Sequence, residues 1–271
     1  MIQESRFAGL FYPNTRHELE SSITTFFNSL TYKKEEDTTG IIMPHAGYRY
    51  SGSVAAESIY DTQTKRYKTA VIVGPSHHYQ FFGASILDKK AYETPLGNMH
   101  IDEKKVKVIL KNKTNEHIIY EPKAYKNEHS IEVILPFLQI LHPSITIIPI
   151  VIGQYNNKLI EDIAHSINQN CNAEETLVIT STDFSHFLSA EQAKKKDLKA
   201  VALIKEKNIE KLKIEQEKKT IQLCGLGPLL IMMTILNQWE IQTAEHLTYY
   251  HSGMVTGDFS SVVGYNSFRF Y

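Results

Sequence analysis

The chain carries histidines at three places where an apolar, strand-like run ends. His45 lies in "MPHAGY", His77 in "GPSHH" and His186 in "STDFSH". In open α/β sheets, ligands bind beyond the carboxyl ends of the strands, so these side chains could meet in one crevice. A single histidine in such a turn is more often a hydrogen-bonded turn residue than a ligand. The recurrence at three strand ends is what favours a functional site.

Other reactive side chains occur in similar positions. Asp183 precedes His186, Glu128 and His129 open a predicted helix, and Cys224 stands in "LCGLGP" just before another. Each has a simpler interpretation, because an aspartate can cap its own turn and a free cysteine is most often a small buried apolar residue. We therefore treat these residues as candidates that depend on meeting the histidines in space.

The chemistry of such a group follows from its ligand types. Neutral imidazoles with an anionic third ligand bind first-row transition metals. A carboxylate as third ligand favours non-haem iron, a thiolate shifts the preference toward copper or zinc, and three ligands plus a water suit zinc-dependent hydrolysis. Beside a metal, Asp183 could fix the tautomer of His186, and the pair could transfer protons. A thiolate there would have a lowered pKa, which would make Cys224 oxidisable.

The elements that must position these residues alternate between strand and helix patterns. Apolar, β-branched runs predict buried strands at residues 69–75, 144–153 and 176–181, and helical spacing occurs at 15–30, 128–141, 189–219 and 227–239. This alternation predicts an α/β fold with a mainly parallel or mixed central sheet sandwiched by helices. No linker or repeat divides the chain, so we expect a single domain over residues 1–271.

The composition excludes several classes of protein. The 271 residues carry a formal net charge of −1, which gives no general attraction to nucleic acid or to an anionic membrane. Two cysteines cannot form a disulfide framework, and neither a signal-peptide pattern nor a membrane-spanning apolar run occurs. We expect a cytoplasmic protein.

The lysine runs within 193–219 alternate with glutamates, which is typical of solvated helix faces. Nucleotide-binding glycine loops, GxSxG and HExxH are absent.

The order of motifs resembles that of the Memo family, known in bacteria and archaea as AmmeMemoRadiSam system protein B. The resemblance covers nearly the whole chain through "RFAGLFYP", "PHAGYRYSG", "GPSHH", "ETPLGNMHID", "NEHSIEVILPFLQ", "PIVIG", "STDFSH", "LCGLGP" and "VVGYNSFRF". It implies a fold like that of the class III extradiol dioxygenases, with a metal site in a surface crevice.

Carried over by motif, the resemblance implies three metal ligands, His45, His77 and Cys224. It implies catalytic or proton-handling roles for Asp183, His186 and His129. The dioxygenases use a carboxylate as third iron ligand where this chain has a cysteine. The expected cofactor is therefore a transition metal, copper or iron, with zinc as a further choice.

Two classes of function follow. The first is metal-dependent, dioxygenase-like redox chemistry on an unknown small substrate, with metal-dependent hydrolysis as a variant. The second is a non-catalytic binding module that recognises a peptide or phospho-ligand in the same crevice, for which Arg49 is the basic candidate in the sequence. The bacterial family name further implies radical-SAM and AMMECR-type protein partners. No nucleic-acid or membrane partner is expected.

Overall fold

The larger of two β-sheets runs through the centre of the computed structural model, which describes residues 1–30, 37–112 and 116–271. Its strands lie in the order β10-β12-β2-β9-β3-β8-β4-β7, and β11 pairs with β12. Their bounds are β2 (Gly40–Met43), β3 (Thr69–Pro75), β4 (Ala84–Ile86), β7 (Ile118–Ile119), β8 (Thr146–Ile152), β9 (Thr176–Ser181), β10 (His186–Leu188), β11 (Ala244–His251) and β12 (Val262–Phe270).

The sheet is mixed. The neighbours β2, β9, β3 and β8 are parallel, whereas β12 is antiparallel to β2 and β4 is antiparallel to β8. A smaller sheet joins β1 (Ile2–Gln3), β5 (Ala91–Thr94) and β6 (Gly97–His100). The predicted α/β fold with a mixed sheet between helices is confirmed.

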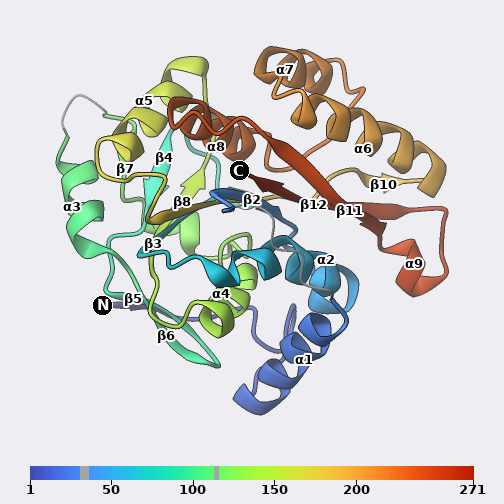
Figure 1. Cartoon of the computed structure of the whole chain (residues 1–271), viewed down its shortest axis with the longest axis horizontal. Coiled ribbons are helices and arrows are strands. Elements are labelled where there is room, and N and C mark those ends of the chain that lie inside the picture. The colour runs from blue at the N-terminus through green and yellow to red at the C-terminus, as the bar shows by residue number, and fades with distance from the viewer. Residues whose placement is uncertain (31–36, 113–115) are drawn as a thin grey trace.

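Helices cover both faces of the larger sheet (Figure 1). On one face lie α5 (Asn157–Asn168), α6 (Ala190–Lys205), α7 (Ile209–Glu217) and α8 (Leu226–Gln238). On the other lie α1 (Arg16–Asn28), α2 (Tyr48–Tyr60) and α4 (Leu135–Leu141). The remaining helical segments are α3 (Glu103–Lys111), α9 (Gly253–Thr256) and the 3₁₀ turns η1 (Asp61–Thr64), η2 (Pro122–Tyr125) and η3 (Glu132–Ile134). No helix in these described ranges is long and apolar enough to cross a membrane.

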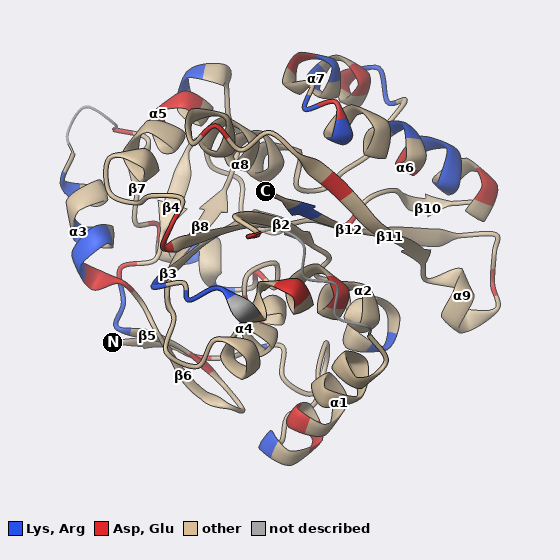
Figure 2. Cartoon of the chain, viewed as in Figure 1, with Lys and Arg blue, Asp and Glu red and all other residues tan. Residues whose placement is uncertain are grey.

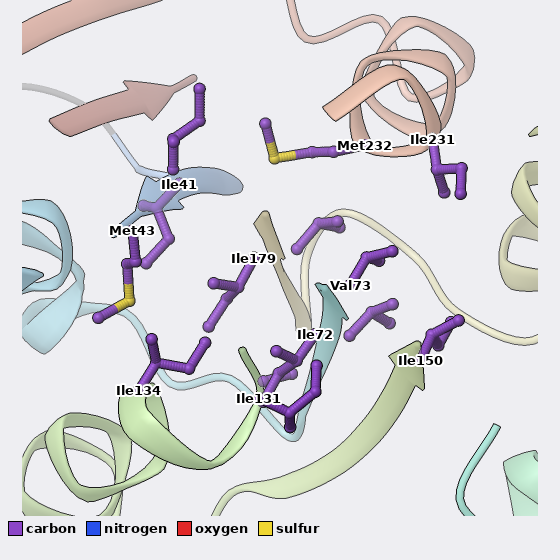
Figure 3. Close-up of a cluster of buried hydrophobic side chains, with 14 of the residues drawn as sticks. Ile41, Met43, Ile72, Val73, Ile131, Ile134, Ile150, Ile179, Ile231 and Met232 are labelled. Atoms are coloured by element: carbon purple, nitrogen blue, oxygen red, sulfur yellow. The ribbon is translucent and has the colours of Figure 1, made fainter. Parts of the chain in front are cut away.

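The core forms because the central strands are apolar on both faces. Figure 3 shows Ile72, Val73 and Ile179 of the parallel strands between α8, which contributes Ile231 and Met232 from one side, and the segment leading into α4 on the other. Such runs are typical of strands that helices cover on both faces. This packing fixes the positions at which the parallel strands end.

Two details of the helices refine the sequence-based predictions. The helix predicted across 128–141 is α-helical only from Leu135, because Pro136 lacks a backbone N–H and is accommodated in the first turn. The preceding residues form the 3₁₀ turn η3 instead. The lysine-rich segment forms α6 and α7, where blue and red residues are interspersed on the outer surface (Figure 2) and Lys199 pairs with Glu215. The predicted solvated helix face is confirmed.

Glu132 ties the N-terminal segment to η3. Its carboxylate is fully buried and accepts hydrogen bonds from the backbone N–H of Arg6 (3.0 Å), the N–H of Phe7 (2.7 Å) and the hydroxyl of Tyr12 (2.6 Å). Buried donors that lose their acceptor are costly. The N-terminal segment therefore depends on one side chain more than a hundred residues away.

We expect Glu132→Ala to lower the free energy of unfolding by about 3 kcal/mol, because it leaves buried donors without a partner. Tyr12→Phe removes one donor and leaves the carboxylate bonded to the backbone, so it should cost about 1 kcal/mol. Urea denaturation of both variants measures the difference. Equal losses would show that the backbone contacts of Glu132 add nothing.

Candidate metal centre

The carboxyl ends of three neighbouring strands bring the candidate residues together. β9 lies between β2 and β3, and Met43 at the end of β2 is paired with Ser181 at the end of β9. His45, His77 and Asp183 each follow their strand by two residues. The structure therefore brings His45 and His77 to one edge of the sheet, as their positions in the sequence predict.

Cys224 completes a group of three metal-ligating side chains. Ligand atoms of His45, His77 and Cys224 all lie within 4.8 Å of one another, and His45 Nε2 is 3.4 Å from Cys224 Sγ. Nitrogen and sulfur ligands of one tetrahedral zinc ion are about 3.5 Å apart, given metal–ligand bonds of about 2.0 and 2.3 Å. The three side chains are thus spaced to hold one ion with little movement.

Cys224 reaches this position because the chain before α8 packs tightly on the end of β9. The Cys224 N–H donates to the carbonyl of Asp183 (3.2 Å), and the Gly225 N–H donates to Thr182 Oγ1 (2.8 Å). A Cβ at position 225 would lie 2.6 Å from Thr182 Cβ and 2.8 Å from the Ser181 carbonyl. The cysteine therefore needs a glycine after it, which accounts for the "CG" pair.

A relay of two serines orients His45, which is 1% exposed. The Ser181 hydroxyl donates to the carbonyl of Ser130, and its oxygen lies 2.8 Å from His45 Nδ1. Because the hydroxyl proton is used on Ser130, the Ser181 oxygen accepts the proton of His45 Nδ1. Nε2 is then the ring nitrogen that faces Cys224 Sγ, at 3.4 Å, and it is the one available to a metal.

Glu128 orients His77 in a similar way. Its Oε2 accepts the His77 backbone N–H (2.6 Å), while Oε1 is 2.9 Å from His77 Nδ1 and also accepts the Ser130 N–H (2.8 Å). The carboxylate is 2% exposed, so little water competes for it. A carboxylate that accepts the second imidazole proton is a common support for a metal-bound histidine.

The charges at the centre favour a thiolate. Burial would raise the pKa of Cys224, but the electrostatic effect of His45 and the hydrogen bonds from His45 and His77 lower it to about 6. Burial would likewise lower the pKa of His77, but its hydrogen bonds to Cys224 and Glu128 raise it to about 10. Without a metal, Cys224 and His77 are therefore a thiolate–imidazolium pair at neutral pH, in which a cation is already held beside the sulfur.

Asp183 and His129 lie next to the three ligands. Asp183 Oδ1 accepts the backbone N–H of His45 (2.9 Å), and burial raises the pKa of Asp183 to about 6. The His129 ring stacks on His77 with centroids 4.8 Å apart, and burial followed by the charge of His45 lowers its pKa to about 3. His77, Glu128 and His129 form a second group of ligand atoms within 4.8 Å of one another.

His186 lies outside both groups. It begins β10, is half-buried, and affects the site through the electrostatic lowering of the Asp183 pKa. The hydrogen bond of the Asp183 carboxylate goes to the His45 backbone, so among the described residues its role is to shape the His45 turn. Arg49 is exposed and lies over the Tyr50 ring.

Ser130 and Ser181 are residues of the centre that the sequence did not identify. They lie 51 residues apart and are joined through a hydrogen bond between a side chain and a carbonyl. Serines are frequent and carry no spacing signature, and only the polar run "STDFSH" at the end of an apolar strand pointed to this segment. A cavity of about 690 Å³ between α1, β6 and α4 is lined by none of the three ligands.

Comparison with known proteins identifies the family of this chain. The family "Memo-like protein" matches residues 3–269. A MEMO1 family protein of Thermoplasma volcanium is 32% identical over 98% of this chain and 97% of its own length. MEMO1 family proteins of Nitrosopumilus maritimus and Saccharolobus islandicus are 31% and 34% identical, over 100% and 97% of both chains. The matched residues include positions 45, 77 and 224, and the chain belongs to the Memo family.

Proposed function

We propose that His45, His77 and Cys224 bind a transition metal, copper or iron, with zinc as a further choice, and that the protein carries out metal-dependent redox chemistry on a small substrate. The observation that supports this best is the spacing of the three ligand atoms within 4.8 Å of one another. Their support by Ser181 and Glu128 adds to it, because oriented ligands are what distinguishes a built site from a chance cluster.

The donor set fits a soft or borderline ion. A thiolate beside two imidazoles favours copper and zinc over magnesium or calcium, which prefer oxygen ligands. A bound copper or iron ion would supply one-electron redox chemistry at this edge of the sheet. Binding releases the His77 proton and uses the thiolate that Cys224 already carries near neutral pH.

Residues beside the ligands would handle protons and exclude water. Asp183, 5% exposed, holds its carboxylate at the His45 turn, and burial raises its pKa to about 6, toward the range in which a carboxyl group can act as an acid or base. His129 stays neutral, so that its ring can accept a hydrogen bond from a substrate. Phe7 and Phe11 contact that ring at centroid distances of 5.6 and 4.7 Å and shield it on one side. His186 acts on Asp183 from a greater distance.

Protein purified without chelator should contain close to one equivalent of metal, which Cys224→Ser and His45→Ala should each remove. Cys171→Ser is the matched control, because Cys171 packs against the core away from the centre. Elemental analysis measures the content of all four proteins. If the wild type binds no copper, iron or zinc even after anaerobic reconstitution, or if Cys224→Ser keeps its metal, the ligand assignment is wrong.

The orientation of His77 gives a second prediction. Glu128→Gln places an amide NH₂ against backbone N–H groups that now donate to the carboxylate, so we expect metal affinity to fall about 10- to 100-fold. Glu93→Gln, an exposed residue of β5, should leave affinity unchanged. Competition with a chromophoric chelator measures both. Equal affinities would mean that Glu128 does not support the ligand.

The thiolate predicts a pH dependence in the metal-free protein. Because the pKa of Cys224 is lowered to about 6, its iodoacetamide alkylation should rise as pH increases through 6 and level off above 7. Cys171 is an internal control, because burial raises its pKa above the ordinary value and delays its reaction to more alkaline pH. Peptide mass spectrometry distinguishes the two sites. Added metal should protect Cys224 alone, and reaction of both cysteines at the same pH would contradict the proposed ion pair.

A further inference from the structure

Two adjoining cavities lie beside the metal centre and share a wall formed by Lys123 and Lys126. The smaller, about 210 Å³, is lined by His78, Tyr79, Lys123, Ala124, Lys126, Asn127 and Glu128. The larger, about 360 Å³, is lined by Ile2, Gln3, Glu4, Arg6, Lys89, Pro122, Lys123 and Lys126. The smaller cavity is lined by His78, which follows the ligand His77 in the chain, and by Glu128, whose carboxylate orients His77.

Local structure directs the two lysines to one side. Lys123 lies in the 3₁₀ turn η2 and Lys126 ends it, with the Lys126 N–H donating to the Lys123 carbonyl (3.2 Å). A 3₁₀ helix has three residues per turn, so residues three apart lie above one another. The Lys123 ammonium also lies 5.8 Å from the centre of the Tyr79 ring. The turn therefore presents two positive charges to the same space.

Two further cations approach from other segments of the chain. The backbone of Arg6 is held by Glu132, and Lys89 Nζ is held by Gln3 Oε1 at 2.7 Å. Burial lowers the pKa of Lys89, with Glu4 raising it and Arg6 lowering it, which places Arg6 and Lys89 within electrostatic range of each other. Like charges held together are unfavourable until an anion joins them.

The charge around these cavities is unbalanced. Arg6, Lys89, Lys123 and Lys126 face one lining carboxylate with free oxygens, that of Glu4. Both oxygens of Glu128 are used by His77 and Ser130. Lys199 of α6 pairs with Glu215 and Lys213 of α7 with Glu210, whereas among the described residues no ion pair is formed by Arg6, Lys89, Lys123 or Lys126. The cations at the cavities therefore differ from the lysines of α6 and α7, which have acidic side chains interspersed among them.

We propose that Arg6, Lys89, Lys123 and Lys126 form a subsite for a dianionic oxyanion group, a phosphate or a pair of carboxylates, on the substrate of the metal centre. This proposal rests on the proposed function, because a subsite for one end of a substrate requires that the neighbouring metal centre acts on that substrate. The chain from His77 to His78 and from Glu128 to Asn127 links the two, and the His78 ring lies 6.3 Å from both His77 and His129. A substrate bound by its anionic end in the cavities would extend toward these rings.

The test uses inorganic phosphate and malonate as probes, titrated by calorimetry at low ionic strength into the protein as purified. Lys123→Gln/Lys126→Gln should weaken binding of the preferred probe at least tenfold. Lys194→Gln/Lys195→Gln, which removes the same charge from the exposed face of α6, should leave it unchanged. Tighter binding of phosphate would identify a phosphorylated substrate, and tighter binding of malonate a dicarboxylate.

Two further measurements separate this proposal from that of the metal site. Metal content of the Lys123→Gln/Lys126→Gln variant should equal that of the wild type, and Cys224→Ser should still bind the probe. Loss of metal in Cys224→Ser with retained probe binding supports both proposals. Absence of probe binding to the wild type, or equal weakening by both double lysine variants, would overturn the oxyanion subsite and leave the metal proposal standing.

Discussion

The parallel pairing of β2, β9 and β3 is the constraint on which the site depends. Side chains alternate between faces along a strand, so a slip of one residue in this register would send the Ser181 side chain to the opposite face from His45. It would also move the Thr182 and Asp183 positions against which Cys224 and Gly225 pack. The apolar core on both faces of these strands is what holds the register, and so the hydrophobic packing and the chemistry cannot be separated.

The parts of the structure that the sequence predicts well are those with strong local signals. The runs that became β3, β8 and β9 are continuous, β-branched and buried on both faces, which few other structures allow. The convergence of His45 and His77 follows from the same signals, because parallel strands end at one edge. β11 was missed because "AEHLTYYH" mixes polar and aromatic residues along a strand that is mostly half-buried. Its pairing with β12 depends on tertiary contacts and not on a local sequence pattern.

The site residues show where local reasoning stops. A pairing of Asp183 with His186 is a natural expectation from their separation of three residues, but after β9 the chain turns away and His186 pairs with Val263 of β12. The Asp183 carboxylate instead accepts a hydrogen bond from the backbone N–H of His45. The sequence gives Glu128 as a candidate but does not show what it does, because the group it orients, His77, lies 51 residues away in the chain. Long-range hydrogen bonds of this kind produce no periodic pattern in the sequence.

The clamp that Glu132 makes on the N-terminal segment carries Phe7 and Phe11 onto the His129 ring. This segment lies outside the central sheet and is held by Glu132, by the Tyr48 N–H that donates to the Phe11 carbonyl (2.8 Å) and by the buried Tyr12 ring. One side of the imidazole cluster is thus covered by a part of the chain that the parallel strands do not position. The ligands and their cover have separate supports, so a substitution at Glu132 would alter the shielding of His129 without touching the hydrogen bonds that orient His45 and His77.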